Sequence, residues 1–235
     1  MAVVFRTGSS AVGEAAAFSF SHSPGGNDRA LLVGMIFADP LGDQQGVIGA
    51  TFAGLPLELV PLGGVAGTAG VELYRLVAPP VGAANVVINL SATCRAALVA
   101  LSYEGVHQTT PWGVSAGAGG TSTTAAVTTP VTETGGLVVD VVGAFGDATA
   151  LGGTPHGGQT KRVEQESGGT VARSVCLMGD DVSGGAVALA WTLTAAAPWR
   201  HIALELRAAP AGGVRARGRL GGGIIRRPGR IRASD

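Results

Sequence analysis

Charged residues are scarce in this 235-residue sequence, at 14%, and aromatic residues make up only 5%. About a quarter of an average soluble domain is charged, and a freely diffusing protein usually keeps its net charge away from zero. This chain has a formal net charge of zero. The composition therefore argues against a freely diffusing cytosolic enzyme and predicts a surface made largely of Thr, Ser, Gly and Ala, which suits packing against neighbouring molecules.

Several sequence signals are missing. No apolar run is long enough for a transmembrane helix, and the first ten residues lack the basic region and the long apolar stretch of a secretion signal. Glycine is abundant, at 39 residues, but it recurs with no fixed period, which excludes a collagen-like chain. We expect a soluble chain that is made in the cytoplasm.

Cysteine is also rare, with Cys94 and Cys176 both inside strand-like segments. A disulfide between them is one interpretation. We favour two buried free thiols, because an unpaired cysteine behaves as a small hydrophobic side chain.

Three nearly unbroken apolar runs stand out, at residues 27–38, 135–145 and 199–208. Each is bounded by turn residues and is short, so each predicts a buried central strand. A longer glycine-rich segment, 105–120, predicts a loop that contains Trp112. Alternating segments elsewhere predict shorter strands, which include 3–6, 14–22, 47–52, 55–60, 71–77, 84–90, 95–104, 121–129, 159–166, 170–178 and 186–194.

Helical periodicity is almost absent. About a dozen short strands, separated by turns that contain glycine or proline, are typical of a β-sandwich or barrel. No linking segment is long enough for a crossover helix, so the sheets should be mainly antiparallel. We predict an all-β chain in which residues 1–210 form one antiparallel, jelly-roll-like β-sandwich domain.

The last 25 residues, 211–235, differ from the body of the chain. They contain seven arginines and one acid, a net charge of +6, whereas the body contains nine basic and fifteen acidic residues, a net charge of −6. Glycines interrupt the segment and its apolar residues are isolated, so it cannot bury a core of its own. We predict an extended basic arm.

The arm has three interpretations: a solvated end, a segment that binds nucleic acid phosphates, or a segment that docks on an acidic neighbouring subunit. The isoleucines among the arginines favour protein docking over nucleic acid, and no aromatic side chain is present to stack on bases. The residues expected to contact a partner subunit are Arg215, Arg217, Arg219, Ile224, Ile225, Arg226, Arg227, Arg230, Ile231 and Arg232.

Six motifs in order carry a resemblance to a known family. The chain resembles the Gly/Thr-rich β-sandwich modules of bacterial surface proteins and tailed-phage virion proteins. The resemblance covers roughly residues 14–208 and implies a jelly-roll-like fold with a structural or adhesive role and no established catalytic residues. A module that stands alone with a basic arm favours the virion version. The motifs are NDRALLVG (27–34), FAGLPLELV (52–60), VELYRLVAPP (71–80), YEGVHQTTP (103–111), GGLVVDVV (135–142) and AWTLT (190–194).

Catalytic and metal-binding patterns are weak. The histidines, His22, His107, His156 and His201, are isolated and form no metal pair at helix or hairpin spacing. A hydrolase with a Ser-His-Asp triad is disfavoured because no G-x-S-x-G turn is present. We expect no catalytic residue, no metal and no cofactor.

Acidic residues offer one alternative, a calcium site. Asp180 and Asp181, with Asp140 and Asp147 elsewhere, could supply oxygen ligands. Without a D-x-D-x-D-G loop, solvated turn carboxylates are the preferred interpretation.

Asp140 is unusual because it lies inside an apolar run. We expect its side chain on the solvent face of the strand. The alternative is burial beside a cation such as Arg29 or Arg200.

The three tryptophans bear on carbohydrate binding, since exposed aromatic rings stack on sugars. Trp191 and Trp199 fall in strand patterns and should belong to the core. Trp112, in the predicted loop, is the candidate glycan contact.

Two functions follow. The first is a non-enzymatic structural protein of a tailed-phage virion, a head decoration or tail-associated subunit, which forms homo-oligomers and contacts other virion subunits through the sandwich and the arm. The alternative is a lectin-like carbohydrate-binding or adhesion module. Neither function involves a membrane.

Overall fold

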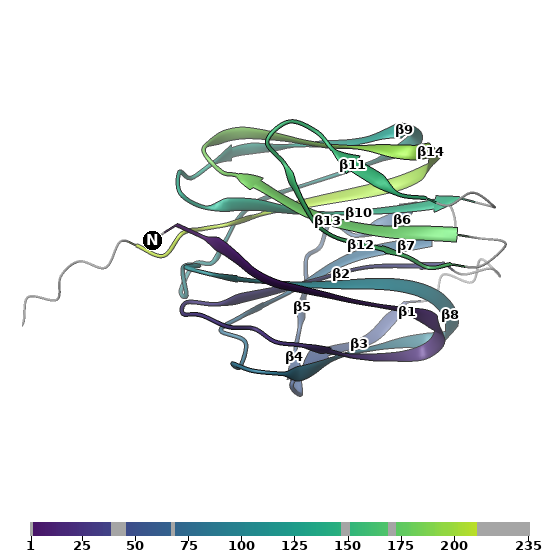
Figure 1. Cartoon of the computed structure of the whole chain (residues 1–235), viewed down its shortest axis with the longest axis horizontal. Coiled ribbons are helices and arrows are strands. Elements are labelled where there is room, and N and C mark those ends of the chain that lie inside the picture. Colours follow the sequence, from purple (N-terminus) through teal and green to yellow (C-terminus); the bar gives the residue numbers. More distant parts are fainter. Residues whose placement is uncertain (1, 39–45, 67–68, 147–150, 169–172, 211–235) are drawn as a thin grey trace, which may run out of the picture.

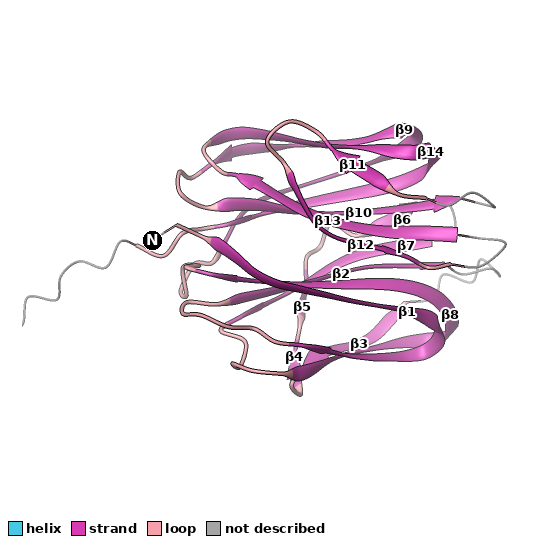
Figure 2. Ribbon diagram, viewed as in Figure 1, coloured by secondary structure: helices cyan, strands magenta, loops and turns pink. Residues whose placement is uncertain are grey.

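The computed structural model describes residues 2–38, 46–66, 69–146, 151–168 and 173–210. Every regular element in these ranges is a β-strand (Figure 2), and all strand pairs are antiparallel, as predicted. The strands are β1 Val4–His22, β2 Ala30–Ala38, β3 Val47–Phe52, β4 Leu55–Pro56, β5 Glu58–Leu59, β6 Gly64–Ala66, β7 Ala69–Val77, β8 Ala84–Glu104, β9 Trp112–Thr132, β10 Leu137–Gly146, β11 Gly153–Pro155, β12 Thr160–Glu166, β13 Arg173–Val182 and β14 Gly185–Leu206.

The strands form two sheets whose main strands follow the same order. The first sheet runs β4-β3-β8-β2-β7-β5, with β1 also on β8 and β6 also on β7. The second runs β11-β14-β10-β13-β12, with β9 also on β14. β1, β2, β3, β7 and β8 thus correspond to β9, β10, β11, β13 and β14. The chain therefore consists of a first half, β1 to β8, and a second half, β9 to β14, that repeat one topology.

Each half is built on a long two-stranded ribbon that folds back on itself (Figure 1). β1 pairs with β8 over its whole length, but at the bend residues 15–17 of β1 face residues 89–94 of β8. The ribbon of β9 and β14 has the same mismatch, with 122–124 facing 192–197. Extra residues on one strand of a pair bend it, so each ribbon contributes to two layers.

The result is four stacked layers with cores between them. In the first half, 4–15 and 94–104 lie with β2 and β7 in an inner layer, while 17–22 and 84–90 lie with β3 and β4 in an outer layer. In the second half, 112–122 and 197–206 lie with β10, β12 and β13 in an inner layer, while 124–132 and 185–192 lie with β11 in an outer layer.

Alternating side chains of each inner layer fill two different cores. In β2, Leu32 and Ile36 face the second half, whereas Leu31, Val33 and Met35 face the outer layer of the first half. β10 behaves in the same way, which explains why both strands read as unbroken apolar runs. The central core, between the two inner layers, joins the halves.

The halves approach each other closely at two glycines of the central strands. A Cβ on Gly34 of β2 would lie 2.7 Å from Val141 Cγ2 of β10 and 2.7 Å from Met178 Sδ of β13. A Cβ on Gly143 of β10 would lie 2.4 Å from Val71 Cγ2 of β7. Gly34 of β2 thus meets β10 and β13, and Gly143 of β10 meets β7 and β2.

The three predicted central strands are confirmed, and several predicted boundaries are wrong. Pairs of predicted short strands are single long strands, because a bend, and not a turn, separates them; this applies to β1, β8 and β14. The segment 55–60 is two separate short strands, β4 and β5. The segment 105–120, predicted as a loop, is a strand from Trp112 onward. Pairing with β14 makes it a strand, although its glycine content does not favour one.

Candidate interaction surfaces

The Asp140 carboxylate accepts four hydrogen bonds inside the second half. Its Oδ2 accepts from Trp191 Nε1 at 2.6 Å, His201 Nε2 at 2.7 Å and Gln159 Nε2 at 2.8 Å. Its Oδ1 accepts from the Gly179 N–H at 3.0 Å. Asp140, Trp191 and His201 are 0% exposed. This cluster ties β10 to β13, β14 and the segment before β12.

The predicted solvent-facing position of Asp140 is therefore wrong, because the outer layer of the second half covers that face of β10. Its partners are neither Arg29 nor Arg200. The predicted core positions of Trp191 and Trp199 are confirmed, and so are the two buried free thiols, Cys94 and Cys176.

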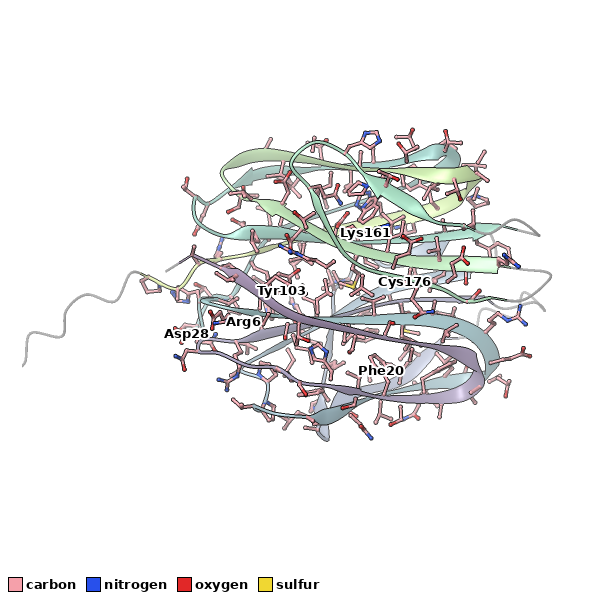
Figure 3. All side chains as sticks on the ribbon, viewed as in Figure 1. Arg6, Phe20, Asp28, Tyr103, Lys161 and Cys176 are labelled. Carbon is pink, nitrogen blue, oxygen red and sulfur yellow. The ribbon has the colours of Figure 1, made fainter. Side chains whose placement is uncertain are left out.

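A second polar cluster links the two halves. Asp180 Oδ2 accepts from the Tyr103 hydroxyl of β8 at 2.9 Å, and Arg162 holds both oxygens of Asp180, at 2.7 and 2.9 Å. Burial, and then the Asp180 carboxylate, raise the pKa of Tyr103, so its hydroxyl stays protonated and donates. Figure 3 shows Tyr103 and Cys176 between the halves. Asp180 is 3% exposed, so the prediction of a solvated turn carboxylate is wrong for it.

The first half contains one Ser–His contact, between Ser9 Oγ and His22 Nδ1 at 2.8 Å. Such a contact is the starting point of many nucleophilic sites. Here the His22 side chain is 1% exposed and packs edge-on against Phe52, and burial lowers its pKa to about 4. The contact is part-buried, because Ser9 lies partly at the surface while His22 belongs to the core of the first half.

The buried clusters thus hold the layers together. No group of three or more His, Cys, Asp or Glu side chains in the described ranges is arranged to hold a metal ion. The described elements include no helix that is long and apolar enough to cross a membrane.

The surfaces most unlike those of an ordinary soluble protein are the two outer layers. Their strands, as far as the structure describes them, contain no Asp, Glu, Lys or Arg. The exposed residues of the second-half outer layer are Thr124, Ala126, Thr128, Pro130, Thr154, Ala186, Ala188 and Thr192. Those of the first-half outer layer are Ala17, Ser19, Ser21, Ile48, Leu55, Pro56, Asn85 and Asn89.

Charged side chains gather instead on the inner layers and in the turns. Ion pairs link Arg6 to Glu104, Arg75 to Glu58, and, at 3.3 Å, Arg95 to Glu14. The stack of layers therefore has a charged middle and two uncharged ends. Protein contacts tolerate uncharged small side chains well, because nothing has to be desolvated at high cost.

Trp112 begins β9 and is half-buried against the central core. The Arg75 guanidinium lies 5.2 Å from the centre of its ring, a cation–π contact. Trp112 is thus part of a strand with one neighbour already on its ring, not a residue at the tip of a loop.

The ten predicted arm residues lie outside the described residues, as does Asp147. Among the described histidines, His107 accepts the Thr109 and Thr110 N–H groups in a turn, and His156 contacts Thr192 on the second-half outer layer.

Comparisons of the chain with models of known protein families, with curated proteins and with solved structures find no match.

Proposed function

We propose that this chain is a non-enzymatic structural protein of a tailed-phage virion, either a head decoration or a tail-associated subunit. In this proposal the body is a jelly-roll-like sandwich that forms homo-oligomers, and residues 211–235 form a basic arm that docks on neighbouring virion subunits. The protein is made in the host cytoplasm and ends in the virion.

The observation that carries the proposal is the pair of uncharged outer layers. A protein that works alone in solution has reason to cover its ends with Lys and Glu, whereas a subunit that is covered by neighbours does not. The opposite net charges of the body and of residues 211–235 supply a second means of attachment between subunits.

Deletion of residues 211–235 tests the proposal. We expect the truncated protein to fold, with an unchanged circular dichroism spectrum, and to be missing from purified particles by mass spectrometry, in which the full chain is found. Normal incorporation of the truncated protein, or absence of the full chain from particles, would contradict it.

A carbohydrate-binding role is the second candidate, and the half-exposed ring of Trp112 favours it. If the protein binds glycans, Trp112→Ala should remove binding on a glycan array, while Trp199→Phe, a change in the core, should preserve it. An array without signal for the full chain, with and without calcium, would exclude this role.

A further inference from the structure

The edge strands of a sheet can cause unwanted association, because their unpaired backbone N–H and C=O groups can pair with a strand from another chain. Most such strands in the described ranges are protected. β4, β5, β6 and β11 are only two or three residues long. β12 carries Lys161, Arg162, Glu164 and Glu166 and has a shift in register. β1 carries Arg6 and Glu14 and is also shifted, between Phe5 and Thr7.

β9 lacks this protection. It is 21 residues long, contains no charged side chain, and pairs with β14 alone in the described part of the chain. Its proline, Pro130, lies beyond the bend. The limb before the bend pairs with β14 without any shift from Ser115 to Ser122. We call the outward side of residues 115–122 the β9 edge.

The direction of the backbone groups along this edge follows from two observations. The N–H of Arg207, the residue after β14, donates to Pro111 O, just before β9. The backbone N–H and C=O groups of the odd-numbered residues of β14 therefore point toward β9. Pro198, which is opposite Thr121, has no N–H to donate. Alternation along an antiparallel pair then points the N–H and C=O groups of Ser115, Gly117, Gly119 and Thr121 away from β14.

We propose that the β9 edge pairs with the β9 edge of a second copy of this chain, antiparallel and about a twofold axis at Ala118. This register places Ser115 opposite Thr121 and Gly117 opposite Gly119, so that outward groups meet outward groups. It joins the second sheets of two molecules into one. The inference rests on the assembly role proposed above and names the surface and partner for it.

A second copy fits this edge better than a foreign peptide for two reasons. Strand addition gains its specificity from pockets for alternate side chains, and the Ser, Ala, Gly and Thr residues of 115–122 form none. Self-pairing also brings no like charges of the two β9 strands together, since β9 contains no charged residue.

Disulfide trapping tests the register. In the proposed pair the two Ala118 Cα atoms are separated by about 4.5 Å, as in a non-hydrogen-bonded antiparallel pair, and a disulfide accepts this separation. Full-length Ala118→Cys should give a covalent dimer on mild oxidation. Ser19→Cys, on the exposed face of the other half, should not, and the wild-type chain, with both cysteines buried, sets the background. No dimer above that background would overturn the proposal.

Removal of one outward N–H tests the edge without a disulfide. Thr121→Pro should weaken dimerisation at least tenfold in sedimentation velocity while the circular dichroism spectrum stays unchanged. Ala126→Pro is the matched control, because its N–H also points away from β14 but lies beyond the bend. Equal dimerisation of wild type and Thr121→Pro, or a loss confined to Ala126→Pro, would overturn the proposal.

These outcomes are separate from those for the virion role. A chain that dimerises through the β9 edge but is absent from particles would defeat the proposed function and leave this inference standing. If the chain is found in particles but Ala118→Cys gives no covalent dimer, the proposed function stands and this inference is defeated.

Discussion

At the scale of single residues, buried polar groups do most to fix the arrangement of the layers. Asp140 satisfies four donors from three directions, and Asp180 joins the halves through Tyr103 and Arg162. Such a buried acceptor contributes less to the free energy of unfolding through its own hydrogen bonds than its removal costs. Its removal leaves buried donors that cannot form hydrogen bonds with water.

Removal of the Asp140 carboxylate should therefore be severe. We expect Asp140→Ala to lower the free energy of unfolding by about 3–5 kcal/mol, and Asp140→Asn to cost less because one acceptor oxygen remains. Urea denaturation gives both values. Asp181→Ala removes a half-buried carboxylate whose one hydrogen bond within the described residues comes from the adjacent Val182 N–H, and it should cost under about 1 kcal/mol. Similar costs at 140 and 181 would contradict the structural role of the cluster.

His22 gives the molecule a dependence on pH. Burial lowers its pKa to about 4 in the folded state, against about 6.5 in the unfolded chain. As pH falls, the unfolded chain therefore takes up the proton first, so stability is full above pH 6.5 and falls by up to about 3 kcal/mol as pH drops to 4. His22→Gln should show a correspondingly smaller loss in urea denaturation between pH 7 and pH 4.5. An identical loss in both proteins would show that His22 is not responsible.

At the scale of elements, close packing between β2 and β10 allows no side chain at Gly34 or Gly143. A methyl group at Gly143 would meet Val71 Cγ2 at 2.4 Å and Ile36 Cδ1 at 3.2 Å. We expect Gly143→Ala to destabilise the protein by about 1–3 kcal/mol through overpacking, measured by thermal and urea unfolding. Gly25→Ala, where no atom lies within 4 Å of an added Cβ, should be nearly neutral. A neutral Gly143→Ala would mean that the halves can move apart at no cost.

The alternation of apolar and polar residues along the sequence predicts the two faces of some strands well. In 71–77, the alternating segment that predicts a strand, Val71 and Leu73 lie in the central core and Tyr74 lies in the other core of the first half. The alternation failed for Asp140, since the layer that covers this residue comes from a bend some 50 residues later in the chain. It failed for 112–120 as well, because pairing with β14, and not the propensity of Gly and Ala, makes this segment a strand. The two polar clusters depend on contacts between distant segments, so no local pattern could have predicted them.

At the scale of the whole molecule, the repeated topology describes two similar halves that share a central core. Neither half can cover its inner layer alone, since a separated half would expose central-core residues such as Val99 and Leu101 of the first half or Ile202 and Leu204 of the second. The segment that connects the halves, from Gln108 to Thr110, is a turn at the surface.

A chain cut between Thr109 and Thr110 should therefore reassemble. We expect fragments 1–109 and 110–235, when produced together, to copurify with a β-rich circular dichroism spectrum, whereas either fragment alone should aggregate or form a homodimer. Copurification on a tag placed on one fragment is the measurement. Two fragments that fold separately as monomers would contradict a shared core.

Both ends of the described chain lie at one pole of the molecule. The Val3 N–H donates to Gly135 O, and the Ala209 N–H donates to Gly105 O, next to the turn that links the halves. The bends of the two long ribbons lie at the opposite pole (Figure 1). A neighbouring molecule that binds this pole would consequently leave the folded-back tips of both ribbons pointing away from it.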